Sequence, residues 1–236
     1  GMLHAVDDIS FKINDGETLG VVGESGCGKS TLGRTILHMT PPTDGQVIFD
    51  GEDCSKPNKE ELKQMREKMQ MIFQDPMACL NPRKKVIDII AEGLDIHHIC
   101  KNRADREERV AKILQKVGLA PEHAERYPHQ FSGGQRQRLA IARAIAKQPQ
   151  IYLFDDSFSA LDYQTDAALR QALAKQTHDA TVIIVAQRLS TILHADQILV
   201  LDGGRIVGRG THSALLRSCE TYREIALSQL SAAELG

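Results

Sequence analysis

The sequence contains no tryptophan, and Phe and Tyr supply only 4% of its 236 residues. It also lacks any apolar run near the roughly 18 residues of a membrane-spanning helix, and nothing at its start resembles a signal peptide. Its 29 Lys and Arg residues nearly balance its 31 Asp and Glu residues, so the charge gives no argument for binding nucleic acid or an anionic membrane surface. These absences predict a cytoplasmic globular protein that acts without nucleic acid.

Cysteine is also scarce, and its distribution excludes the usual structural uses of that residue. The five cysteines are odd in number and follow no metal-ligand spacing. We therefore expect reduced thiols in a cytosolic protein rather than disulfides or a zinc site; the residues concerned are Cys27, Cys54, Cys79, Cys100 and Cys219.

One glycine-rich stretch stands out. Residues 23–30 read Gly-Glu-Ser-Gly-Cys-Gly-Lys-Ser and fit G-x-x-x-x-G-K-[ST], with an apolar stretch before them and a helical pattern after them. Glycines let backbone N–H groups turn onto phosphate oxygens, and the helix N-terminus adds partial positive charge. We expect Lys29 to reach the β and γ phosphates and the Ser30 hydroxyl to bind Mg²⁺. The predicted nucleotide-binding residues here are Gly23, Ser25, Gly26, Cys27, Gly28, Lys29, Ser30 and Thr31. The alternative is a glycine-rich turn with a chance Lys-Ser pair.

Strand and helix patterns alternate along most of the chain, which predicts an α/β fold with a mostly parallel sheet flanked by helices. The expected strands are 5–13, 17–22, 46–49, 69–73, 151–154, 180–185, 197–201 and 206–208. The expected helices are 30–39, 58–68, 85–97, 103–117, 132–147, 163–177, 190–194, 211–217 and 222–235.

The stretch 76–127 has no convincing strand pattern, so we expect a helical lobe inserted into the sheet. The predicted organisation is one domain over 1–236, with a sheet core at 1–74 and 149–236 and a helical lobe at 75–148. A hairpin turn at 202–205 predicts a small antiparallel portion.

An acid follows the apolar strand 151–154. Asp155 would emerge at the carboxyl end of a central strand, beside the phosphate loop, where it can hold Mg²⁺ through water. Alone this pattern is weak, but with the loop upstream it supports a nucleotide site.

The order of these motifs resembles the ATP-binding cassette (ABC) transporter ATPases over essentially the whole chain. The residues that carry the resemblance are the phosphate loop, Gln74, the Ser-Gly-Gly-Gln signature at 132–135, the pair Asp155 and Asp156, and the segment 159–162. A lone helix cap at Ser132 is the alternative for the signature.

The resemblance implies a P-loop NTPase-type fold and a head-to-tail dimer of this chain with itself or a homologous subunit. Each ATP would lie between the phosphate loop of one subunit and the signature of the other. Gln74 would contact Mg²⁺ and the attacking water, and a transmembrane transporter subunit would dock beside residues 75–80, placing the protein at the inner face of the membrane. The further ATP-binding residues implied are Ser132, Gly133, Gly134, Gln135 and Asp162.

Two departures from the family concern catalysis. Asp156 stands where the family usually has the Glu that polarises the attacking water, and Gln187 stands where it has a switch histidine. The Asp side chain is one methylene shorter, and Gln cannot carry a proton. Because loss of a well-placed general base costs roughly 10²–10⁴-fold, we expect ATP binding with slow hydrolysis.

The two halves resemble different branches of the family. Residues 5–148 resemble oligopeptide/dipeptide importer ATPases, and residues 151–236 resemble the degenerate-site subunit of heterodimeric exporters. This predicts a chimera joined near 145–152, with a natural mosaic as the alternative. The rival function is an engineered or structural ATP-binding module with negligible hydrolysis and no role in transport.

The family also stacks adenine on an aromatic residue that precedes the phosphate loop. No aromatic residue precedes Phe11 here, and Phe11 belongs to an expected strand. On this basis we expect that the adenine platform is missing and that nucleotide affinity is weak.

Overall fold

The computed structural model describes residues 5–96, 98–158, 161, 166, 169, 173, 180–231 and 234–235. Asp162, the rest of the predicted motif at 159–162 apart from Leu161, and most of the predicted helix 163–177 lie outside these residues.

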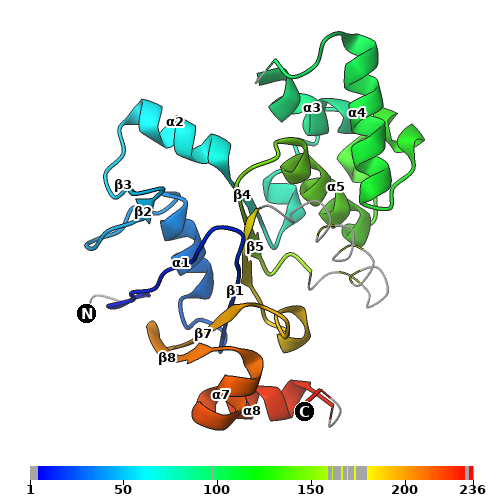
Figure 1. Ribbon diagram of the computed structural model, residues 1–236. Coiled ribbons are helices and arrows are strands. Elements are labelled where there is room, and N and C mark those ends of the chain that lie inside the picture. The colour runs from blue at the N-terminus through cyan, green and yellow to red at the C-terminus, as the bar shows by residue number, and fades with distance from the viewer. Residues whose placement is uncertain are drawn as a thin grey trace.

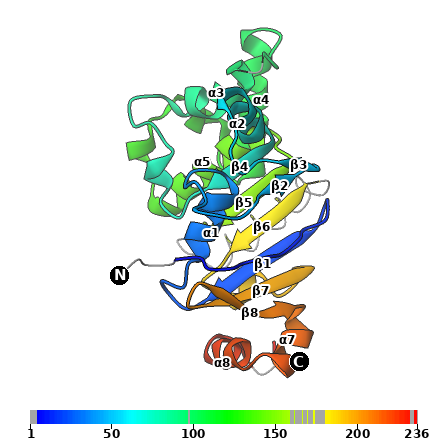
Figure 2. The ribbon, with the colours of Figure 1, turned by 90° about the vertical axis from the view of Figure 1, so that its left-hand side faces the viewer.

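A six-stranded sheet forms the centre of the molecule, in the order β4-β5-β6-β1-β7-β8 (Figures 1 and 2). All neighbours are parallel except the β7–β8 hairpin. A separate antiparallel pair joins β2 (Ile48–Phe49) to β3 (Glu52–Asp53). The predicted α/β class is confirmed. The main strands are β1 (Thr18–Gly23), β4 (Met69–Ile72), β5 (Ile151–Asp155), β6 (Thr181–Val185), β7 (Gln197–Asp202) and β8 (Arg205–Gly210).

Helices cover both faces of the sheet and build a group beside its β4 edge (Figure 1). Within the described residues, the α-helices are α1 (Lys29–Ile36), α2 (Lys59–Lys68), α3 (Val86–Ile96), α4 (Arg103–Lys116), α5 (Gly133–Ala146), α7 (His212–Ser218) and α8 (Glu220–Gln229). Short 3₁₀ turns are η1 (Pro76–Ala78), η2 (Pro121–Glu125), η3 (Pro128–Gln130) and η4 (Leu189–Thr191).

Strand β1 is apolar and buried along most of its length because helices pack on both of its faces. Leu19 and Val21 join the core under α1, whereas Val22 points the other way and joins the core under α8. This is the period-2 alternation of a strand with no solvent-facing side. The phosphate loop therefore begins, at Gly23, at the end of a strand that is packed on both faces.

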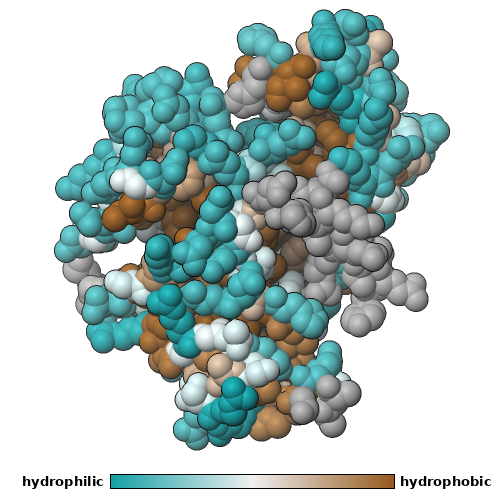
Figure 3. Space-filling view, in the orientation of Figure 1, coloured by the Kyte–Doolittle hydropathy of each residue, from teal (hydrophilic) through white to brown (hydrophobic). Residues whose placement is uncertain are grey.

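Helices α3, α4 and α5 bury their own apolar faces against one another. Val86, Ile90 and Leu114 are fully buried there, together with Leu139 and Ile141 of α5. No strand occurs among the described residues between β4 and β5. The surface over α2, by contrast, is largely hydrophilic (Figure 3).

Three local predictions were wrong. Residues 5–13 form no strand: the apolar side chains of their alternating pattern, such as Val6 and Phe11, do pack on the core, but the backbone joins no sheet. The expected helix 190–194 is the 3₁₀ turn η4, and the expected last helix ends at Gln229. The two-residue strand β3 was not expected, because Glu52 and Asp53 carry no apolar pattern.

Candidate active site

The phosphate loop connects β1 to α1 with glycines in backbone conformations that other residues avoid. Gly26 and Gly28 have φ values of 82° and 100°. A Cβ on Gly28 would lie 1.9 Å from the carbonyl oxygen of Ala5, so the position also excludes any side chain. Gly28 caps α1 without a side-chain hydrogen bond. The first N–H groups of α1 are therefore directed toward the loop, where an anion can accept from them.

The ammonium group of Lys29 is folded over this loop. Its Nζ donates to the carbonyl oxygens of Gly23 at 2.7 Å and Glu24 at 2.6 Å, and it lies 3.7 Å from the Cys27 Sγ. Both Lys29 and Cys27 are buried. The structure thus places a desolvated positive charge beside the backbone that would hold phosphate.

Ser30 and Asp155, predicted as Mg²⁺ ligands and 125 residues apart in the sequence, meet at this loop. The Ser30 hydroxyl donates to Asp155 Oδ1 at 2.7 Å, and Asp155 is only 2% exposed. A hydroxyl and a carboxylate fit Mg²⁺, which prefers a few protein oxygens and fills its other positions with water and phosphate.

Gln74 and Asp156, two of the three residues predicted to be catalytic, also lie in contact. They follow the neighbouring strands β4 and β5. Gln74 Nε2 donates to Asp156 Oδ2 at 3.0 Å. Asp156 is buried and has a φ of 47°, a conformation held by its N–H donating to the carbonyl of Val185 at 2.8 Å. This left-handed backbone is uncommon for a residue other than glycine, and it turns the chain sharply at the end of β5.

Gln187 follows β6 by two residues, at the same edge of the sheet. Its side chain is exposed, and its carbonyl oxygen accepts from Gln229 Nε2 at 3.0 Å. Residues after β1, β4, β5 and β6 therefore share the carboxyl edge of one parallel sheet, the usual place for a ligand in such folds.

The predicted signature lies elsewhere, at the start of α5. Ser132 Oγ accepts from the Gln135 N–H at 3.3 Å, and Gln135 Oε1 accepts from the Ser132 N–H at 3.0 Å. Ser132 and Gly133 are exposed, and a Cβ on Gly133 would meet nothing within 4 Å. The capping box is thus present, as the helix-cap alternative requires, but Ser132 and Gly133 face open solvent.

One residue of this region was not predicted. Gln137 on α5 is fully buried, and its Nε2 donates at 3.2 Å to the carbonyl of Phe73, the residue before Gln74. Its Oε1 has no hydrogen-bond partner. The only hint in the sequence is a polar side chain on the apolar face of the helix that carries Leu139 and Ile141. Gln137 ties the signature helix to the strand end that presents Gln74.

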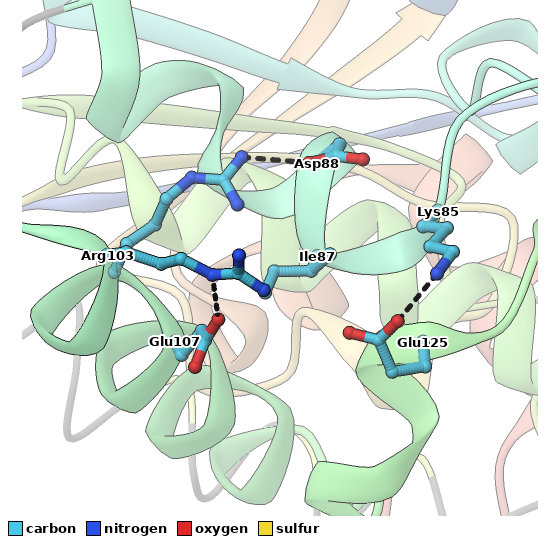
Figure 4. Close-up of a pocket in the computed structure, with 7 residues that line it drawn as sticks. Lys85, Ile87, Asp88, Arg103, Glu107 and Glu125 are labelled. Atoms are coloured by element: carbon cyan, nitrogen blue, oxygen red, sulfur yellow. Dashed lines mark hydrogen bonds and ion pairs between the residues drawn. The ribbon is translucent and has the colours of Figure 1, made fainter.

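A cavity of about 380 Å³ lies away from these residues, where α3, α4 and η2 meet (Figure 4). Its charged groups satisfy one another: Lys85 pairs with Glu125 at 2.7 Å and Arg103 with Glu107 at 2.7 Å. Arg106 reaches both Asp88 and Asp95, and these carboxylates raise the pKa of its guanidinium. The cavity therefore supplies no uncompensated charge that would attract a nucleotide.

Comparison with known proteins decides between the phosphate-loop families. A family model described as ABC transporter matches residues 6–159. The chain belongs to the ABC transporter family. It is an ATP-binding cassette of an ABC-type ATPase.

Relatives of this cassette include ATP-binding proteins of peptide transport. It is 50% identical over 212 residues to the oligopeptide transport ATP-binding protein OppF of Bacillus subtilis, covering 88% of this chain and 69% of that protein. It is 40% identical to the dipeptide transport ATP-binding protein DppF of Escherichia coli, covering 92% and 66%.

Solved ABC cassettes share this fold over most of the chain. An ATP-bound bacterial Atm1-family ABC exporter superposes with a TM-score of 0.83 at 31% identity, covering 95% of this chain and 39% of that one. The dimeric cassette MJ0796, in a post-hydrolysis state with ADP and Pi, gives 0.79 at 29% identity, covering 88% and 90%.

These matches do not support the expected chimera. The likeness to OppF extends over 212 residues, which is longer than the segment 5–148, and the likeness to the exporter covers 95% of the chain. Neither resemblance is confined to one half. Among the residues that the structure describes, none of the helices is both long and apolar enough to cross a bilayer.

Proposed function

We propose that this cassette binds ATP with Mg²⁺, pairs head to tail with a second cassette around the nucleotide, and hydrolyses ATP slowly to drive a transmembrane transporter subunit. The observation that carries the proposal is the 2.7 Å contact between Ser30 and Asp155, which joins the phosphate loop to the acidic end of β5. Lys29, on the same loop, supplies the positive charge that a triphosphate requires.

The bound nucleotide would use residues already gathered at the sheet edge. Gly23, Ser25, Gly26, Cys27, Gly28 and Thr31 belong to the loop or the start of α1, where backbone N–H groups can donate to phosphate oxygens. Mg²⁺ would offset the negative charge of the phosphates. Gln74 and Asp156 are hydrogen-bonded to each other, so the Gln74 amide orients the carboxylate that would take a proton from the attacking water.

The exposed start of α5 supports pairing with a second cassette. Ser132, Gly133, Gly134 and Gln135 offer a hydroxyl and N–H groups at a helix N-terminus that faces solvent. Such a site suits the γ-phosphate held by another chain, as in a head-to-tail dimer. Asp162 is proposed to border the same nucleotide; it lies outside the described residues.

The names of the relatives suggest which substrate is transported. OppF and DppF are named for oligopeptide and dipeptide transport. We therefore assign this cassette to a peptide transporter, acting at the cytoplasmic face of a membrane beside its transmembrane partner.

Thermal denaturation with and without ATP and Mg²⁺ tests the nucleotide site. Ligand at 100 times its Kd stabilises a protein by about 2.7 kcal/mol, which corresponds to a rise in Tm of roughly 5 °C or more for a chain of this size. We expect Lys29→Ala to abolish this rise.

Lys63→Ala serves as the matched control, because Lys63 is exposed on α2, away from the loop. It should keep the full rise in Tm. An unchanged rise in the Lys29→Ala protein would refute the assignment of the phosphate site.

A further inference from the structure

The last residue of α8 is hydrogen-bonded on both sides of the loop that follows β6. Gln229 Nε2 donates to the carbonyl of Gln187 at 3.0 Å, and Gln229 Oε1 accepts from the Leu189 N–H at 2.9 Å. One side-chain amide thus uses its donor and its acceptor on two backbone groups that flank Arg188. A satisfied amide in this arrangement fixes both the position and the orientation of the peptide units it bridges.

The helix that carries this amide is firmly anchored. Tyr222 and Ala226 of α8 are fully buried, in one core with Leu189 and Val22. The imidazole of His212 bridges the Tyr222 hydroxyl at 2.8 Å and the carbonyl of Glu234 at 3.1 Å. Figure 2 shows α8 below β8, at the end of the sheet opposite α3 and α4. Gln229 therefore reaches the loop from a rigid element.

The loop itself leaves the sheet just before the Gln229 contacts. Ala186 still donates to the carbonyl of Val21 at 2.9 Å, as a continuation of the β6–β1 pairing. The chain then turns into η4, where Thr191 donates to the carbonyl of Arg188 at 3.2 Å. Gln187 lies between these two anchors, with its side chain exposed at the carboxyl edge of the sheet.

We propose that Gln229 is a positioning residue for ATP hydrolysis: it holds the backbone of residues 187–189 so that Gln187 is presented to the γ-phosphate. This rests on the proposed function and on the further assignment that Gln187, at the position of the family's switch histidine, contacts the γ-phosphate. Helix α8 thereby sets the geometry of a site to which it contributes no contacting atom. Because a displacement of about 1 Å can cost as much as 10²-fold in rate, loss of this support is expressed mainly in kcat.

Two variants separate the halves of the contact. Gln229→Ala removes both hydrogen bonds, whereas Gln229→Glu keeps an acceptor for the Leu189 N–H and removes the donor to Gln187. Leu227→Ala is the control on the same helix, since Leu227 is 64% exposed. The variants and the parent are compared by ATPase kinetics under single-turnover and steady-state conditions and by hydrogen exchange of the backbone amides at 187–192.

For Gln229→Ala we expect about a tenfold fall in kcat, a KM within about twofold of the parent, and faster exchange of the Leu189 amide. For Gln229→Glu we expect a similar fall in kcat with the Leu189 amide still protected. Leu227→Ala should match the parent in all three measurements.

A double-mutant cycle shows whether Gln229 acts through Gln187. In a Gln187→Ala background, Gln229→Ala should lower kcat no further, since the side chain it positions is gone. Additive losses in the cycle would overturn the proposal. So would unchanged exchange of the Leu189 amide in the Gln229→Ala protein, or faster exchange in that protein with an unchanged kcat. The parent protein tests the proposed function separately. If it shows neither ATP-dependent stabilisation nor ATP turnover, the proposed function is wrong irrespective of the residue at position 229.

Discussion

Asp156 has a side chain one methylene shorter than the Glu usual in the family, and its backbone conformation is constrained. Its φ of 47° and its bond to Val185 fix where the Cα–Cβ bond points, and the Gln74 amide holds the carboxylate at 3.0 Å. A longer acid at this position reaches further from the same backbone. In the proposed function, where Asp156 is the base, side-chain length at this fixed backbone would set the distance between the carboxylate and the attacking water.

Replacing Asp156 and Gln187 with the residues usual in the family should raise the rate of ATP turnover. We expect Asp156→Glu with Gln187→His to raise kcat at saturating ATP by about 10- to 100-fold, because a well-placed base contributes roughly 10²–10⁴-fold. Steady-state phosphate release measures this. Asp15→Glu, in an exposed turn, is the control for adding a methylene. Equal turnover in the parent and the double variant would show that these two residues do not limit hydrolysis.

At the scale of elements, α2 is a helix whose start is specified locally. The Asn58 side chain accepts from the N–H groups of Glu60 at 2.9 Å and Glu61 at 3.0 Å, and Glu61 Oε2 accepts from the Asn58 N–H at 2.8 Å. We expect Asn58→Ala to lower the free energy of unfolding by about 1 kcal/mol. The ATP-induced rise in Tm should not change, because α2 takes no part in the phosphate site.

Urea denaturation measures the cost, with Asn58→Asp as the variant that keeps a capping oxygen. Asp should retain most of the stability that Ala loses. If both substitutions have the same effect, the cap contributes nothing and the change arises in the unfolded chain.

The same locality explains which elements could be predicted from the sequence. Helices α2, α4 and α5 begin within one residue of the starts expected at 58, 103 and 132. Each is capped locally, by Asn58, Asn102 and Ser132, because an N-cap side chain bonds to N–H groups two or three residues away. The segment 5–13 was predicted as a strand because its apolar pattern is that of a strand. Whether its backbone pairs depends on neighbours that are distant in the sequence, and the pattern holds no information about them.

The residues of the site also fall into those that a local motif predicts and those that depend on distant contacts. The loop at 23–30 and Asp155 are recognisable because each is a short motif next to an apolar strand, and their meeting follows from the parallel sheet. Gln137 and Gln229 were missed. Their bonds reach Phe73 and Gln187, which are 64 and 42 residues away, and no local pattern marks an amide that fixes a distant backbone. The division of the chain into 1–74, 75–148 and 149–236 stays a prediction.

For the whole molecule, the placement of the site follows from sheet order. Strands β4, β5, β6 and β1 are neighbours and parallel, so their carboxyl ends bring Gln74, Asp156, Gln187 and the phosphate loop to one edge. The signature at the start of α5 belongs to the helical group beside the β4 edge of the sheet (Figure 1). Gln137 bonds to Phe73 and joins the two parts directly.

The solvent-facing N-terminus of α5 has a consequence for how the rate of ATP turnover depends on protein concentration. If Ser132 and Gly133 complete the nucleotide site of another chain, each ATP is bound by two chains at once. The rate of hydrolysis then depends on the concentration of the protein as well as that of ATP. Turnover per chain should rise about in proportion to protein concentration when the dimer is scarce, and level off once most chains are paired. A dilution series at saturating ATP measures this dependence. A rate per chain that is constant across the series would mean that one chain hydrolyses ATP alone.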